Sequence, residues 1–292
     1  MMSAMERESW IKDKICLITG ANSGIGKQTA FELNRMGANV VMFCRNKQRA
    51  ENAMNDIKNE NGNTNIDLII GDLADLDSVR QAVSEFKNKY DKLHVLINNA
   101  GSINAKKQLT VDGFEKTWGT NYLGHFLLTM LLLEKLKASA PSRIIILSSI
   151  MHKYTSKNPL EDMNYEHKKY KHFEAYGNSK LMNLWFTYEL ARKLEGTGVT
   201  VNAVHPGIIR TRFGKNKDNP WWYRLIYTIG GPFLNSVAKG ARTPVYLASS
   251  DEVSGITGKY WVKSKQKKSS KLSRNIELQK QLWEKSLEFT KN

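Results

Sequence analysis

The chain has 292 residues, 41% of them hydrophobic, which is enough for one large core in a single domain spanning residues 1–292. Its only cysteines, Cys16 and Cys44, lie in apolar runs, which argues against a disulfide framework and for a reducing, intracellular setting. The formal charge of +16 predicts a surface that attracts phosphates, anionic lipid or nucleic acid, but a positive electrostatic field does not by itself assign a function.

The ends of the chain and its apolar runs carry no targeting or spanning signal. Residues 1–13 form a charged tail without the apolar stretch of a secretory signal. The longest apolar run, 126–133, is far too short to span a bilayer. We therefore expect a cytoplasmic protein, peripheral to a membrane at most.

Seven apolar runs predict β-strands, and most are continuous rather than alternating, as in strands buried on both faces of a parallel sheet. They cover residues 14–19, 39–44, 66–71, 93–98, 143–149, 199–205 and 258–262. Helical periodicity appears between them, at 26–36, 78–90, 121–137 and 176–194. This alternation predicts an α/β fold with a single Rossmann-type doubly wound parallel sheet of about seven strands flanked by helices.

Three segments depart from this alternation. A long polar insertion covers 151–174, and an aromatic segment, 219–233, follows the sixth strand. A C-terminal amphipathic helix is expected near 276–289. Half of the residues in 263–274 are basic, which is typical of a solvated loop.

The segment TGANSGIGK follows the first predicted strand. Its glycines would let backbone amides approach a pyrophosphate at a helix N-terminus. The spacing differs from the usual dinucleotide pattern and a plain turn is the alternative, but the position between a first strand and a first helix favours a nucleotide-binding loop. The expected cofactor contacts here are Gly20, Asn22, Ser23, Gly24, Ile25 and Gly26.

The end of the second strand bears on the choice of cofactor. An acid there would bind the ribose 2′-hydroxyl of NAD, but Cys44 and then Arg45 occupy this place. A guanidinium can bind the extra phosphate of NADP, so NADP(H) is favoured over NAD(H). The alternative is that Arg45 is only a solvent-facing charge.

Polar and small residues also follow the third and fourth strands. Asp72, next to Leu73, could accept a hydrogen bond from an adenine amino group, although capping of the helix that begins at DLDS is an alternative. After the fourth strand, Asn99, Ala100 and Gly101 would let backbone contact a flat ring or a sugar.

A tyrosine and a lysine share one helix face in AYGNSK. Tyr176 and Lys180 are four residues apart, so their side chains lie one turn from each other. Taken alone, such a pair is ordinarily a solvated surface feature.

These motifs coincide with a known pattern. TGANSGIG, NNAG, TNYLGHF, LSS, YGNSK and HPGIIRT occur in the order and at the intervals of the classical short-chain dehydrogenase/reductases, which the chain resembles from about residue 14 to 262. It is similar to the retinol dehydrogenase-like branch, by TGANSGIGK, CRN, the long stretch between Ser149 and Tyr176, and GKYW. The resemblance implies an NADP(H)-dependent oxidoreductase acting on a lipophilic alcohol or carbonyl, retinoid-, steroid- or fatty-aldehyde-like.

The resemblance also implies catalytic roles. Tyr176 would donate or accept the proton, Lys180 would bind the nicotinamide ribose, and Ser149 would polarise the substrate oxygen. A free tyrosine titrates near 10, so a base at neutral pH requires cationic neighbours such as Lys180 and the nicotinamide. Asn121 would support a proton relay through a helix bulge that exposes its carbonyl. A buried amide tying helix to strand is the alternative for Asn121, and Ser148 is expected to be structural.

After the sixth strand, HPGIIRT is implied to hold the nicotinamide carboxamide through Pro206, Gly207, Ile209 and Thr211, although Pro206 and Gly207 could simply end a strand. The apolar segment within 212–240 is implied to be a substrate lid, with a core helix or a dimer contact as the alternative. None of the six histidines shows the spacing of a metal site.

The remaining expectations concern partners. Aromatic and basic residues near the lid fit weak contact with an anionic membrane surface. No basic-aromatic motif indicates nucleic acid binding. A homodimer or tetramer is implied only by the resemblance, and a catalytically silent NADP-binding regulatory protein of the same fold is the alternative function.

Overall fold

A computed structural model of the protein describes residues 9–207 and 236–291. Within these ranges, eight strands form one sheet in the order β3-β2-β1-β4-β5-β6-β7-β8. The parallel strands are β1 (Ile15–Thr19), β2 (Asn39–Cys44), β3 (Ile66–Ile70), β4 (Val95–Asn98), β5 (Ser142–Leu147), β6 (Val199–His205) and β7 (Lys259–Val262). The strand order reverses between β1 and β4, which is where ligands bind in sheets of this type. The predicted doubly wound α/β fold is confirmed.

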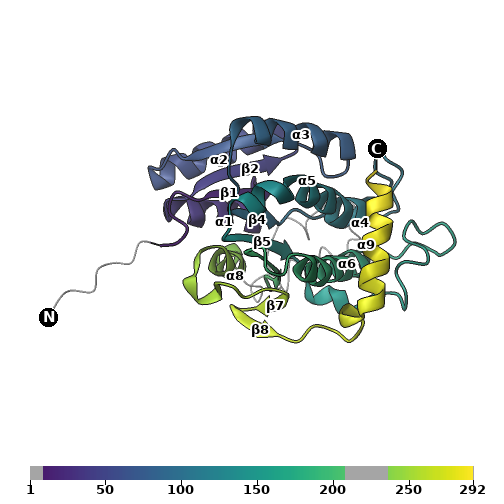
Figure 1. Ribbon diagram of the computed structural model, residues 1–292. Helices are drawn as coiled ribbons and strands as arrows, with labels where there is room; N and C mark the ends of the chain where they lie inside the picture. Colours follow the sequence, from purple (N-terminus) through teal and green to yellow (C-terminus); the bar gives the residue numbers. More distant parts are fainter. Residues whose placement is uncertain (1–8, 208–235, 292) are drawn as a thin grey trace.

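Helices cover both faces of the sheet (Figure 1). One face is packed by α1 (Gly24–Arg35), α2 (Lys47–Asn61) and α8 (Val237–Ser249). The other face is packed by α3 (Leu76–Lys89), α5 (Gly124–Ala138), α6 (His172–Lys193) and α9 (Ile276–Phe289). A single short turn, α4 (Lys116–Trp118), and a π-helical turn, Gly119–Leu123, lead into α5.

The two helical layers explain why the strands are apolar at successive positions. In β1, Leu17 packs into the core on the α5 side, whereas Cys16 and Ile18 pack into the core on the α1 side. Successive side chains of a strand point to opposite faces, so a strand covered on both faces needs apolar residues throughout. Both cysteines are therefore buried, free thiols of the core.

The eighth strand was not predicted. β8 (Lys265–Lys267) pairs antiparallel with β7 inside the segment that was expected to be a solvated loop. The two strands are joined by Lys263 and Ser264, with φ of 51° and 56°. Two-residue hairpin turns of this kind usually contain Asn or Gly, so Lys-Ser gave no turn signal. The basic, exposed side chains of β8 suit the edge of a sheet.

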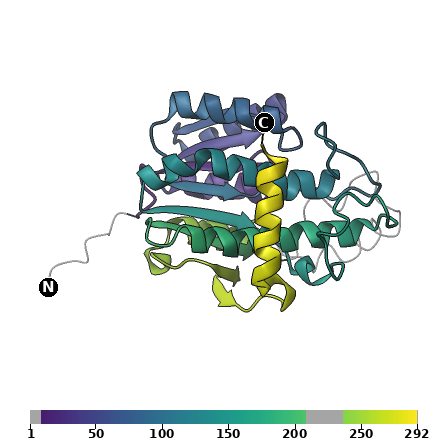
Figure 2. The ribbon, with the colours of Figure 1, turned by 45° about the vertical axis from the view of Figure 1, so that its right-hand side comes forward.

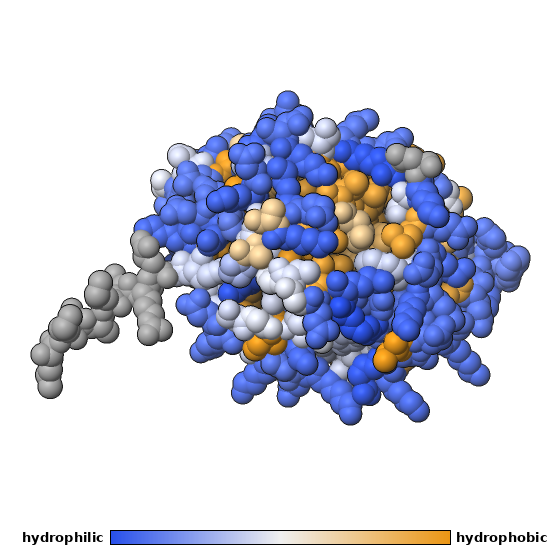
Figure 3. Space-filling model, viewed as in Figure 1, coloured by the Kyte–Doolittle hydropathy of each residue, from blue (hydrophilic) through white to orange (hydrophobic). Residues whose placement is uncertain are grey.

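The C-terminal helix lies where the sequence predicts it. α9 crosses α6 (Figure 2), and its residues Leu282 and Trp283 are buried against the α5–α6 core. Hydrophobic colour also gathers in the middle of the face seen in Figure 3, where Figure 1 places α5. None of the helices described is long and apolar enough to cross a bilayer.

Candidate active site

The glycine loop, residues 20–26, joins β1 to α1. Gly20 and Gly24 adopt φ of +66° and +56°, which side chains rarely allow. A Cβ on Gly26 would lie 2.4 Å from the Gly20 carbonyl oxygen. The cap residue Ser23 makes no side-chain hydrogen bond to the first turn of α1, so amides at this helix end remain for a ligand. This close, amide-rich turn fits a dinucleotide pyrophosphate.

Cys44 and Arg45 lie beside this loop at the end of β2. Cys44 is 2% exposed, and burial raises the pKa of its thiol to about 11, so it remains an inert thiol. The side chain of Arg45 is 67% exposed, and its Nη1 lies 3.5 Å from Oδ2 of Asp72. An exposed pair at this distance is weak, so the guanidinium can still bind a phosphate.

Asp72 does not cap the following helix. Asp75 is the cap of α3, because its side chain accepts the amide hydrogen of Ser78 at 2.9 Å. Asp72 instead accepts from the Ala74 amide at 3.0 Å, and its other oxygen faces Arg45. Leu73 packs against the start of α5, where a Cβ on Gly124 would lie 2.2 Å from the Leu73 carbonyl oxygen.

A threonine that the sequence analysis did not single out ties β1 to the end of β4. The Thr19 hydroxyl accepts the amide hydrogens of Asn99 and Ala100, both at 2.9 Å. The Asn99 side chain donates to the Thr19 carbonyl at 2.7 Å. The position of the Thr19 hydroxyl directly before the glycine loop is the sequence feature that could have indicated this role. Gly101 lies next to the predicted catalytic residue Lys180, because a Cβ on Gly101 would lie 3.4 Å from Lys180 Nζ.

Tyr176 and Lys180 come together on α6 as predicted from their spacing. Lys180 is 3% exposed, its Nζ donates to the Leu147 carbonyl at 3.1 Å, and this nitrogen lies 5.6 Å from the centroid of the Tyr176 ring. Burial lowers the pKa of Lys180 to about 8, which leaves most of it charged at neutral pH. A solvated surface pair, the alternative for these two residues, does not describe a buried ammonium.

The two serines after β5 differ in environment. Ser148 is buried and donates its hydroxyl hydrogen to the Lys180 carbonyl at 2.8 Å. Ser149 is partly exposed, and its hydroxyl accepts the amide hydrogen of Met151 at 3.2 Å. Its own hydroxyl hydrogen can still be donated to a ligand.

Asn121 lies in the π-helical turn that precedes α5, which is the kind of bulge that the sequence analysis expects. Its side chain is fully buried and bonds to the backbone of Ser102, at 2.7 and 2.9 Å, and to Ser179 at 3.0 Å. The side chain is thus a buried structural amide, but it ties the turn to the loop after β4 and to α6 rather than to a strand. A role in proton transfer therefore rests on the main-chain carbonyl.

Two buried histidines contact the backbone of predicted catalytic residues, and the sequence analysis did not single them out. Nδ1 of His125 lies 3.0 Å from the Asn121 carbonyl oxygen. Nδ1 of His152 lies 2.6 Å from the Ser149 carbonyl oxygen, and its Nε2 accepts from the Ser270 amide at 3.2 Å. His125 is part of TNYLGHF and lies four residues after Asn121, but nothing in the sequence relates it to Thr19.

Some of the predicted residues fall at or beyond the end of β6. Gly207 has φ of +96° and donates its amide hydrogen to Nδ1 of His205 at 3.3 Å, directly after Pro206. Ile209, Thr211 and most of the expected lid lie outside the described residues. The last part of the 212–240 range forms the beginning of α8.

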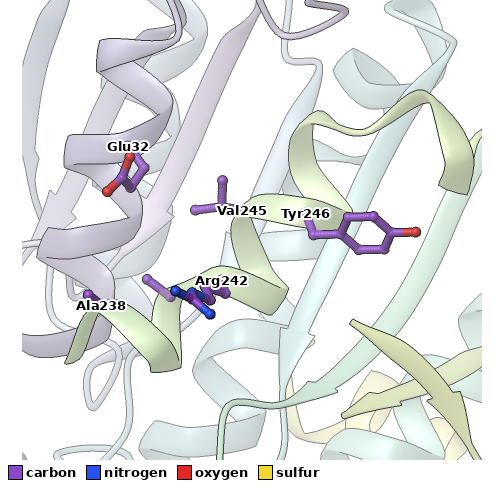
Figure 4. Close-up of a pocket in the computed structure, with 6 residues that line it drawn as sticks. Glu32, Ala238, Arg242, Val245 and Tyr246 are labelled. Carbon is purple, nitrogen blue, oxygen red and sulfur yellow. The ribbon is translucent and has the colours of Figure 1, made fainter. Parts of the chain in front are cut away.

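A cavity of about 400 Å³ lies elsewhere, between α1 and α8 (Figure 4). Glu32 of α1 and Arg242, Val245 and Tyr246 of α8 line it, together with two alanines, and none of the predicted site residues does. Across residues 9–207 and 236–291, no group of three or more His, Cys, Asp or Glu side chains could hold a metal ion.

Comparison with known proteins agrees with this geometry. A family model described as short chain dehydrogenase matches residues 14–160 and 163–220. Retinol dehydrogenase 14 of Mus musculus is 44% identical over 282 residues, covering 93% of this chain and 84% of the relative. Polyprenol dehydrogenase of Homo sapiens is 40% identical over 285 residues, covering 95% of this chain and 85% of the relative.

Solved structures share the fold. A protein from Mycobacterium paratuberculosis superimposes with a TM-score of 0.76 at 33% identity, covering 96% of this chain and 94% of the other. A short chain dehydrogenase structure from Escherichia coli CFT073, complexed with NADPH, gives 0.69 at 21% identity and covers 89% of this chain and all of the other. The chain belongs to the short-chain dehydrogenase family of oxidoreductases, in its retinol dehydrogenase-like branch.

Proposed function

We propose that the protein is an NADP(H)-dependent oxidoreductase that interconverts a lipophilic alcohol and the corresponding carbonyl compound, with Ser149, Tyr176, Lys180 and Asn121 as its catalytic group. The observation that carries this proposal is the buried ammonium of Lys180, which lies 5.6 Å from the Tyr176 ring and next to Gly101. Burying a cation costs free energy unless the charge is paired or hydrogen-bonded. Here the buried ammonium can be paired with a phenolate, which it stabilises.

Each residue of this catalytic group has a separate role in the reaction. Bound NADP(H) supplies or accepts the hydride. Tyr176 takes the hydroxyl proton of an alcohol, or returns it to a carbonyl oxygen, and the Lys180 charge favours the phenolate that this requires. Ser149 donates its hydroxyl hydrogen to the same substrate oxygen and so stabilises negative charge developing on it. The Asn121 carbonyl supports the exchange of the proton with solvent.

The glycine loop and Arg45 support the choice of cofactor. Gly20, Gly24, Gly26 and the amides at the start of α1 would hold the pyrophosphate. Arg45 presents an exposed guanidinium where an acid would select NAD, so we assign NADP(H). Asp72, Asn99, Ala100 and Gly101 would border the adenine and ribose portions.

Apolar side chains next to Ser149 support a lipophilic substrate. Ile150 and Tyr154 are 38% and 57% exposed, although such side chains usually avoid water. Ile150 follows Ser149 directly and Tyr154 is five residues beyond it, so a hydrocarbon placed against them would bring its polar end to the catalytic hydroxyls. Retinol and polyprenol, after which two of the relatives are named, are alcohols with long hydrocarbon chains.

The decisive experiment is Tyr176→Phe, which removes one hydroxyl and little else. We expect oxidation of retinol with NADP⁺, and reduction of retinal with NADPH, to fall by at least about a thousandfold, while binding of NADPH measured by its fluorescence stays unchanged. Tyr246→Phe, which removes a hydroxyl from α8 away from the predicted site residues, is the matched control and should retain turnover. Equal activity of Tyr176→Phe and the native protein would contradict the mechanism.

A panel of retinoids, steroids and fatty aldehydes, each with NADPH and NADH, tests the substrate class. Tight NADPH binding without turnover of any member would favour the silent regulatory protein instead.

The charge of +16 also supports weak contact with anionic membranes, which sedimentation with phosphatidylserine vesicles at low and physiological salt would detect.

A further inference from the structure

A buried histidine links the glycine loop to Asn121. His125 is the second residue of α5 and is 1% exposed. Its Nδ1 lies 3.0 Å from the carbonyl oxygen of Asn121, and its Nε2 lies 2.8 Å from the hydroxyl oxygen of Thr19. One ring therefore contacts both the end of β1 and the π-helical turn.

The contacts determine which ring nitrogen carries the hydrogen. A carbonyl oxygen can only accept, so Nδ1 is the donor to Asn121. Burial lowers the pKa of His125 to about 4, which keeps the ring neutral at pH 7 and makes Nε2 an acceptor. Thr19 then donates to Nε2 while its oxygen accepts from the amides of Asn99 and Ala100. Each hydrogen-bonding group of this set has a partner of the correct kind.

We propose that His125 is a positioning residue, which holds the main-chain carbonyl of Asn121 in place for proton transfer and couples that carbonyl to the cofactor loop through Thr19. This inference rests on the proposed function. Because the Asn121 side chain is already bonded to Ser102 and Ser179, its carbonyl is the group through which Asn121 can act. The Lys180 charge also reaches His125, so the ring lies within the electrostatic environment of the catalytic group.

Two substitutions separate the contacts of the ring. His125→Asn places an amide N–H near the position of Nδ1, so it retains the bond to Asn121 and loses the bond to Thr19. His125→Gln places its amide near the position of Nε2, so it retains Thr19 and loses Asn121. Both replacements are polar amides of similar size, and each serves as the control for the other.

We expect one variant to change kcat and the other to change the affinity for NADPH. His125→Gln should lower kcat roughly tenfold and shift the pH dependence of kcat, while NADPH binding stays within about twofold. His125→Asn should keep kcat and its pH dependence, and should weaken NADPH binding several-fold. Equal kcat and an unchanged pH dependence in both variants, or parallel losses explained by a lower Tm, would overturn the proposal.

A measurement without turnover tests the same contacts. ¹⁵N NMR of the histidine-labelled protein with NADPH should show His125 as the neutral Nδ1–H tautomer from pH 6 to 8. An Nε2–H tautomer would overturn the proposal, because Nδ1 could not then donate to Asn121. If the native protein binds NADPH but turns over no carbonyl, the proposed function fails, and the tautomer still decides whether His125 makes these bonds.

Discussion

Replacing Lys180 with methionine tests whether a buried charge makes Tyr176 an effective base. The substitution keeps an unbranched chain in the site but removes the ammonium, which lies 5.6 Å from the Tyr176 ring. With the ring centroid taken as the position of the phenolate charge and an effective dielectric constant of about 20, the ammonium stabilises the phenolate by roughly 3 kcal/mol. This energy corresponds to about 2 pH units, or roughly a hundredfold in the fraction of phenolate.

The assay is the rate of retinol oxidation with saturating NADP⁺ from pH 6 to 10. We expect the pH at which kcat is half-maximal to rise by about 2 units in Lys180→Met, so that kcat at pH 7 falls roughly a hundredfold. The difference should be largest below pH 8, because the pKa of Lys180 is about 8 and its charge is lost above that pH. Lys87→Met, at an exposed position of α3, is the control.

Three outcomes would refute this reasoning. If kcat falls at every pH without a shift of the profile, Lys180 acts by orienting the cofactor rather than by its charge. If NADP⁺ binding is lost instead, its main contribution is to affinity. Retention of the native profile would show that the phenol needs no cationic neighbour.

Three further changes test other parts of the structure. Arg45→Asp should shift preference from NADPH toward NADH, and an unchanged ratio of the two kcat/KM values would contradict our assignment of the cofactor. Gly26→Ala places a Cβ 2.4 Å from the Gly20 carbonyl and the Asn99 amide, so NADPH affinity should fall at least about tenfold and Tm should drop; native binding would show that this loop does not hold the cofactor. Because folding depresses the pKa of His125 from 6.5 to about 4, the unfolded chain binds the proton first, and the free energy of unfolding should decrease as pH falls through this window. By pH 5 the loss is about 2 kcal/mol, and urea unfolding of His125→Asn should lack that share of the pH dependence.

The strands of the sheet were predictable because their apolar runs follow from a simple requirement. Residues such as Leu17 and Ile18 face helices on opposite sides of the sheet, so the run of apolar residues is continuous. The length of this run predicts the length of the strand. β8 escaped prediction because its residues are all exposed and its turn contains neither Gly nor Asn. Short edge strands depend on pairing with a neighbour, which a local pattern does not record.

The candidate site likewise contains features that were predictable from the sequence and contacts that were not. The glycine loop and the Tyr176–Lys180 pair were predictable, because each depends on the spacing of residues within one turn or one helix. The contacts of His125 with Thr19 and of His152 with Ser270 join residues more than a hundred positions apart. Histidine at such positions has no local signature, and only the folded arrangement identifies its partners.

The link from Ser149 through His152 to Ser270 bears on the exchange of segments between relatives. The chain after β7 packs α9 into the core, and its Ser270 amide also bonds to the histidine whose Nδ1 lies against the Ser149 carbonyl. A chimaera that takes this segment from a homologue would therefore also exchange the group that fixes the backbone of Ser149, a proposed catalytic residue. Such hybrids can differ in turnover even though every residue in direct contact with the reactants is identical.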